Sequence, residues 1–187
     1  SGKVSHSNIN SVANKVKELL SEAKNNLGNV DLINDLLGTN TFTRINLSSL
    51  FGPGEFRPDN TFISSKRPLF EPIADSIMKF ASKFPNKKLT ASIIVLGYAD
   101  AGQINPASSL AKELVISMNN NGEATSAELN RELSRLRATV IADMMKTITE
   151  ERKAGQAIFS KFAVETIAQG RGEELPEPSV KYTANDK

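Results

Sequence analysis

The stretch that decides the fold is Leu89-Thr-Ala-Ser-Ile-Ile-Val-Leu-Gly97. It is rich in β-branched residues and its apolar run is nearly continuous, which predicts a central strand covered by helices. The strand runs into Gly97-Tyr-Ala-Asp100-Ala-Gly102, where glycines on both sides of the aspartate predict a loop. Loops at strand ends are where layered folds place their ligand contacts. The end of this strand is therefore the first place to look for function.

Helical periodicity flanks this strand on both sides. Before it, a helix is predicted with Ser65 as its cap, Pro68 in its first turn and Pro85 at its end. After it, a long helix is predicted from a cap at Ser126 to about Ile148. The apolar stripes assigned to these two helices are Leu69, Ile73, Ile77, Phe80 and Phe84, and Leu129, Leu133, Leu136, Val140 and Met144.

The remaining segments complete a layered domain. Alternation predicts a first strand at 41–47 and another at 162–168, and turn residues predict a loop at 51–58. A short helix is expected at 106–118, and the charged segment 150–161 continues the long helix or forms a short second one. Strands separated by helices predict an α+β fold over residues 41–187, with helices packed on a mixed sheet.

Residues 1–40 form a predicted N-terminal helical arm. Ile9, Val12, Val16, Leu19 and Ala23 recur at steps of three and four, Gly28 stops this helix, and a second short helix is expected at 30–37. The spacing is that of a coiled coil, but about two heptads are few for one. The arm is therefore expected to pack on the domain.

Composition excludes several classes of function. The 187 residues are 39% hydrophobic and 24% charged with a net charge of +2, and no basic run suits a phosphate backbone, so nucleic acid is not an expected partner. There is no cysteine and one histidine, His6. A thiol nucleophile, a catalytic triad or a zinc site would lack its residues, so no enzyme, metal or cofactor is expected.

One helix face carries polar side chains that point to a ligand. Asn130, Ser134 and Arg137 stand at i, i+4 and i+7, about 100° around the helix from its leucine stripe. With Asp100 at the strand end, Arg137 completes a pair of opposite charges. The carboxylate of Asp100 takes an ammonium group and the guanidinium takes a carboxylate, so the pair suits a zwitterion.

These residues also carry a resemblance to the OmpA-like family, which includes outer-membrane protein A, the flagellar stator protein MotB and peptidoglycan-associated lipoproteins. The family has a Gly-His-Thr-Asp-x-x-Gly strand end, then Asn-x-x-Leu-Ser-x-x-Arg-Ala on a helix. This chain has Gly97-Tyr-Ala-Asp100-Ala-Gly102 and Asn130-Arg-Glu-Leu-Ser-Arg-Leu-Arg137-Ala138, then Gly170-Arg-Gly172 with Pro176 after it. The similarity covers roughly residues 41–178.

The resemblance implies a βαβαβ fold that binds peptidoglycan of the cell wall without covalent chemistry. It assigns diaminopimelate of the stem peptide to Asp100 and Arg137. Backbone amides of the strand-end loop would assist; the loop residues are Tyr98, Ala99, Ala101 and Gly102. Asn130 and Ser134 complete the ligand-binding set, and we expect them mainly to tie the loop to the helix by hydrogen bonds.

The chain departs from the family at three places. Tyr98-Ala99 replaces His-Thr, insertions fall near 101–125 and 150–161, and no closing strand of the family type follows Pro176 before Lys187.

The expected function is to anchor an outer-membrane protein, lipoprotein or other cell-envelope assembly to peptidoglycan in the periplasm, with any membrane anchor outside these residues. Envelope proteins or a second copy of the chain are further expected partners.

Two alternatives stay open. The first is an OmpA-like module that has lost wall binding and serves as a protein–protein interaction or oligomerisation domain of an envelope complex. The insertions and the replacement of His-Thr by Tyr98-Ala99 favour this alternative. The second is a peptidoglycan hydrolase. It would need paired carboxylates in a cleft, and the sequence offers only Glu173-Glu174 in a turn.

Overall fold

The computed structural model describes residues 14–22, 24, 50–99, 102–119 and 124–174, which belong to two compact units, 1–45 and 46–187. In the first unit, residues 14–22 and 24 are helical and every side chain is exposed. The strand expected at 41–47 and the helix expected at 30–37 lie outside the described residues.

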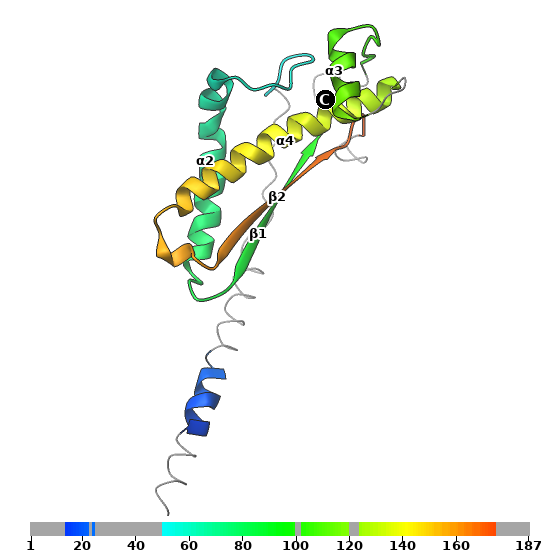
Figure 1. The fold of residues 1–187 in the computed structure, drawn as a ribbon. Helices are drawn as coiled ribbons and strands as arrows, with labels where there is room; N and C mark the ends of the chain where they lie inside the picture. Colours follow the sequence, from blue (N-terminus) through cyan, green and yellow to red (C-terminus); the bar gives the residue numbers. More distant parts are fainter. Residues whose placement is uncertain (1–13, 23, 25–49, 100–101, 120–123, 175–187) are drawn as a thin grey trace, which may run out of the picture. The chain divides into compact units, whose positions relative to one another are not determined.

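The second unit is a mixture of helices and strands, so the α+β class is correct. Its two described strands, β1 (Leu89–Gly97) and β2 (Phe162–Gly170), are parallel neighbours in register from Leu89 opposite Phe162 to Gly97 opposite Gly170. β1 has the bounds that the sequence predicts. The crossover from β1 to β2 contains α3 (Ser109–Ser117), α4 (Ser126–Lys153) and the 3₁₀ turn η1 (Ala157–Phe159) (Figure 1).

The described helices cover one face of the sheet. Ile93 and Val95 of β1 pack against the core, whereas Ile94 is 60% exposed and Leu96 is 42% exposed. The nearly continuous apolar run predicts a central strand covered by helices, and the described helices cover one of its faces. The run reflects β-branched residues that suit an extended backbone on either face.

The cap of α4 lies one residue before the predicted cap at Ser126. Thr125, not Ser126, is the N-cap: its hydroxyl accepts a hydrogen bond from the amide of Glu128, and the Glu128 carboxylate accepts one from the amide of Thr125 at 2.8 Å. These bonds hold the pKa of Glu128 below its ordinary value and satisfy two helix-end amides reciprocally. The helix runs past Ile148 to Lys153, so the charged segment both extends α4 and forms η1.

α2 (Asn60–Ser82) begins about one and a half turns before the predicted start. Its cap is Asp59, whose carboxylate accepts a hydrogen bond from the Phe62 amide at 2.6 Å. Pro68 is consequently inside the helix, where a proline costs about 3 kcal/mol. In the added turns the ring of Phe62 stacks on that of Phe51 at 4.9 Å, which offsets about 0.5–1.5 kcal/mol of this cost.

The buried face of α2 is also rotated by about one residue from the predicted stripe. Leu69 is 50% exposed, and Ile73, Ile77, Phe80 and Phe84 lie at the margin. The buried residues are Phe70, Ala74, Met78 and Ala81. Alanines fill the centre of the contact because α2 packs close to its neighbours. A prediction based on large apolar side chains gives alanine too little weight and therefore misplaces the buried face.

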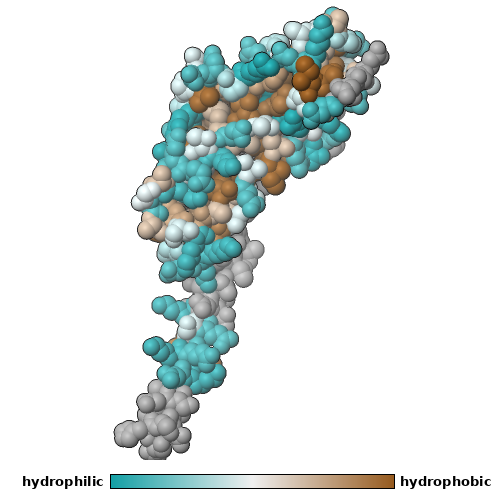
Figure 2. All heavy atoms as spheres, viewed as in Figure 1, coloured by the Kyte–Doolittle hydropathy of each residue, from teal (hydrophilic) through white to brown (hydrophobic). Residues whose placement is uncertain are grey.

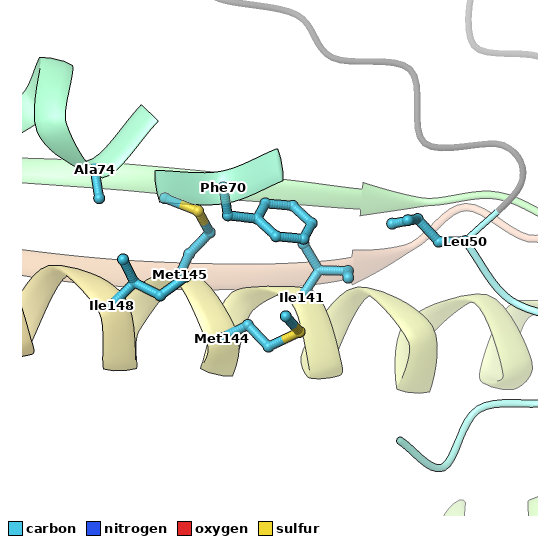
Figure 3. Close-up of a cluster of buried hydrophobic side chains, with 7 residues drawn as sticks. All are labelled: Leu50, Phe70, Ala74, Ile141, Met144, Met145 and Ile148. Atoms are coloured by element: carbon cyan, nitrogen blue, oxygen red, sulfur yellow. The ribbon is translucent and has the colours of Figure 1, made fainter. Parts of the chain in front are cut away.

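The main core lies between α2 and α4. Figure 3 shows Phe70 and Ala74 of α2 facing Ile141 and Met145 of α4. The whole cluster contains Leu50, Phe70, Ala74, Ile141, Met144, Met145 and Ile148. A second cluster around Met78 and Phe162 closes one end of the sheet, and a third joins α3 to α4 through Leu114, Leu129 and Leu133.

Two glycines bring α4 directly onto the carboxyl ends of both strands. A Cβ atom on Gly97 would lie 2.0 Å from the Ser134 carbonyl oxygen, and one on Gly170 would lie 2.3 Å from the Arg131 carbonyl oxygen. Gly97 and Gly170 are opposite each other in the sheet. The backbone of α4 therefore rests on a pair of positions without side chains.

We expect Gly97→Ala to destabilise the domain by about 3 kcal/mol, because the methyl group displaces a helix backbone that cannot yield without moving its whole core face. Gly155→Ala is the control: its Cβ would meet nothing within 4 Å, and only its positive φ costs about 1 kcal/mol. Urea unfolding followed by circular dichroism measures both. Equal losses for the two variants would show that α4 can move away from the sheet.

Candidate functional site

The site lies where both strands end beneath α4. Parallel pairing continues beyond the strands: the Arg171 amide donates to the Gly97 carbonyl at 2.8 Å, and the Ala99 amide donates to the Gly172 carbonyl at 2.7 Å. Ala99 is buried and Tyr98 is half-buried. The chain leaving β1 is thus held in place by the turn that leaves β2.

Asn130 of α4 holds both segments that leave the strands, the one after β1 and the one after β2. Its side chain is 1% exposed, and its amide nitrogen donates to the Gly102 carbonyl at 3.0 Å and to the Glu173 carboxylate at 2.8 Å. A buried amide is costly unless it is bonded. The expected tie from the helix to the strand-end loop is present at Gly102.

Ser134 makes the second tie, one turn further along α4. Its hydroxyl is fully buried, accepts a hydrogen bond from the Gly172 amide at 3.0 Å and donates to the Arg131 carbonyl at 2.8 Å. Gly172 has φ = +57°, a conformation that side chains disfavour. The position of Ser134 therefore fixes the turn that in turn holds Ala99.

Arg137 has a role that sequence reasoning missed. Its Nε donates to the Glu55 carbonyl and its Nη2 to the Gly52 carbonyl, both at 2.8 Å. Its guanidinium carbon lies 5.5 Å from the centre of the Phe51 ring. The forked side chain is thereby oriented by the loop between residues 51 and 58.

That loop contains a tight turn suited to this contact. The Glu55 amide donates to the Gly52 carbonyl at 3.1 Å, Pro53 occupies the second position and Gly54 has φ = +72°. Pro followed by Gly at these positions is typical of a type II turn, and the Gly52 carbonyl that closes the turn also accepts the bond from Arg137. The Pro-Gly pair was visible in the sequence, but nothing there linked it to Arg137.

The other half of the expected clasp cannot be located. Asp100 and Ala101 lie outside the described residues, although the residues on either side of them, Ala99 and Gly102, are both anchored. The six described members of the predicted ligand-binding set occupy the same end of the domain: Tyr98, Ala99, Gly102, Asn130, Ser134 and Arg137.

A buried ion pair fastens the inserted helix α3 beside this site. The Glu132 carboxylate is 8% exposed and accepts hydrogen bonds from Arg135 at 2.6 and 2.7 Å and from the Ser117 hydroxyl at 2.5 Å. Burial alone would raise the pKa of Glu132, but the bonds from Arg135 and Ser117 together lower it. Ser117 is the last residue of α3, so this cluster joins α3 to α4.

A shallow groove of about 320 Å³ lies next to Asn130. It runs between the first turn of α4, at Ala127, Glu128 and Arg131, and the turn that follows β2, from Arg171 to Glu174. Arg131 pairs with Glu174 across it, and Arg171 pairs with Glu174 within the turn. Arg137 is not part of its lining.

Within the described ranges, no cluster of three or more His, Cys, Asp or Glu side chains suits a metal ion. The helices of those ranges are also too short or too polar to cross a membrane.

Comparison with family models, curated proteins and solved structures finds no match to this chain. The interpretation of the site rests on its own residues.

The buried Glu132 carboxylate predicts a pH-dependent contribution to stability. Because its folded pKa is below the ordinary value of 4.5, the contribution is complete above that pH and is lost as the pH falls through the lower, folded pKa. Glu132→Gln should therefore be less stable than the native chain at neutral pH, with a gap that narrows in acid. The exposed Glu165→Gln serves as the control, and a gap independent of pH would contradict the assignment.

Proposed function

We propose that this chain is an OmpA-like domain that binds the stem peptide of peptidoglycan and anchors a protein of the cell envelope to the wall in the periplasm. Binding is non-covalent. The guanidinium of Arg137 takes the carboxylate of a diaminopimelate residue, the carboxylate of Asp100 takes its ammonium group, and amides of the loop from Tyr98 to Gly102 assist. No metal or cofactor takes part in this scheme.

One observation carries the proposal: a single helix carries or fixes the described members of the predicted site other than Tyr98. α4 fixes Gly102 through Asn130, fixes Ala99 through Ser134 and Gly172, and presents Arg137 less than one turn further on. The segment that contains Asp100 is thus anchored at both its ends to the helix that carries Arg137. Two opposite charges on a rigid support suit a zwitterionic ligand.

The contacts of Arg137 favour a ligand role beyond bracing the loop. Bonds to two carbonyls and a neighbouring ring fix the guanidinium plane before any ligand arrives. A fixed guanidinium loses less entropy when it binds a carboxylate than a freely rotating one does. The Gly52–Glu55 turn therefore acts as a support for a carboxylate-binding arginine.

Several described motif residues that carry the resemblance have a physical role in this fold. Gly97 and Gly170 admit α4, Asn130 and Ser134 bond the exit segments, and Ala138 packs 3.2 Å from the position that a Cβ of Gly97 would occupy. Such a pattern of scaffold residues supports the family assignment, because independent spacings have one joint explanation. The same pattern supports wall binding only because the family that it resembles binds peptidoglycan.

Co-sedimentation with protein-free peptidoglycan sacculi tests the proposal. We expect the native chain to pellet and Asp100→Asn and Arg137→Lys to lose about tenfold or more in affinity, since a hydrogen bond to a charged group contributes about 1.5–3 kcal/mol. Arg137→Lys keeps the charge but loses the fork. Excess diaminopimelate in solution should release the native chain.

Arg131→Ala is the matched control for this experiment, because it removes a guanidinium from the same helix that pairs only with exposed partners such as Glu174. It should pellet like the native chain. A native chain that stays in the supernatant sinks the wall-binding proposal. Release of soluble muropeptides during the incubation would instead identify a hydrolase.

A protein-interaction module is the second candidate, and the inserted helix α3 favours it. Ile116 of α3 is 73% exposed, the largest value among the exposed large hydrophobic side chains of the described residues. Figure 2 shows apolar surface gathered over α3. This candidate predicts no binding to sacculi by the native chain, and unchanged stability but loss of self-association or of an envelope partner in Ile116→Asp.

A further inference from the structure

The loop from residues 51 to 58, which orients Arg137, lies against α3. The Cδ2 methyl group of Leu110 on α3 is 3.2 Å from the place that a Cβ atom on Gly54 would occupy. Gly54 also has φ = +72°, a conformation that side chains disfavour. The absence of a side chain at Gly54 therefore lets the tight turn of this loop rest directly on α3.

Two further contacts join α3 to the same part of the loop. The side chain of Phe56 packs against the buried cluster between α3 and α4, in which Leu114 of α3 is fully buried. Nη2 of Arg57 lies 3.2 Å from the Glu113 carboxylate, but both side chains are well exposed to solvent. Exposed ion pairs contribute little, so the apolar contacts at Gly54 and Phe56 are the main attachment of the loop to α3.

α3 is itself fixed on α4. Its first turn is capped by the Ser108 hydroxyl, which accepts a hydrogen bond from the Ala111 amide at 3.1 Å. Its last residue, Ser117, donates a hydrogen bond to the buried Glu132 carboxylate of α4. The contacts form a closed ring, because α4 holds α3, α3 holds the loop, and the loop orients Arg137 on α4.

We propose that α3 is a positioning element of the binding site, with Leu110 as its main contact. The two carbonyls that accept hydrogen bonds from Arg137 belong to Gly52 and Glu55, the first and last residues of the turn. A shift of the turn moves both acceptors together, so the guanidinium plane follows the turn. That this guanidinium binds a carboxylate rests on the proposed function, whereas its orientation by α3 rests on these contacts alone.

Hydrogen exchange of the Arg137 Nε–H group, followed by NMR on the full chain, tests the proposal. This group donates to the Glu55 carbonyl at 2.8 Å, so its hydrogen should exchange slowly in the native chain, and its signal is identified by its absence in Arg137→Lys. Leu110→Ala leaves a gap beside Gly54 that the surroundings fill only in part. We expect it to speed the exchange about two- to tenfold, the factor that corresponds to losing one ordinary hydrogen bond.

Three further variants make this measurement specific. Leu110→Met keeps the volume of the side chain and should restore the native exchange rate. Ile116→Ala is the matched control, because it shortens another apolar side chain of α3 that is 73% exposed, and it should leave the rate unchanged. Urea unfolding identifies the variants that are fully folded, and Leu110→Val, which deletes less of the side chain, gives the same test if Leu110→Ala does not fold. An unchanged rate in Leu110→Ala, or an equal rise in Ile116→Ala, overturns the proposal.

Affinity for peptidoglycan sacculi measures the consequence for binding. In a native chain that pellets, Leu110→Ala should lower the affinity by a factor close to its change in exchange rate, whereas Leu110→Met and Ile116→Ala should keep the native affinity. Faster exchange together with native affinity would show that α3 does not position Arg137 for the ligand, and would overturn the proposal. A native chain that does not pellet sinks wall binding alone, because the exchange rates still decide whether α3 orients Arg137.

Discussion

Everything at the carboxyl end of the sheet depends on the close approach of α4 to Gly97 and Gly170. The Ser134 and Arg131 carbonyls occupy space that any side chain at these glycines would need. Such closeness places the short side chains of Asn130 and Ser134 within bonding reach of segments leaving both strands. At an ordinary helix–sheet separation of about 10 Å, these side chains would not reach them.

The same closeness makes the polar contacts obligatory. Water is excluded beneath α4, so the Gly172 amide has its partner in Ser134, and Asn130 must use both donors of its amide on Gly102 and Glu173. Apolar packing would tolerate small shifts of the exit segments, whereas bonds between buried polar groups define one arrangement. Ala99 and Gly102 are thereby each held in one position.

The sequence was most informative where one local pattern decided the outcome. β1, the long helix and the tying role of Asn130 follow from β-branched residues, periodicity and a recognised motif. It failed where contacts outside the local pattern matter: α2 begins after a cap at Asp59 rather than at Ser65, and Phe62 in the added turns stacks on Phe51. The brace on Arg137 joins residues more than 80 positions apart, and no local pattern encodes such a pairing.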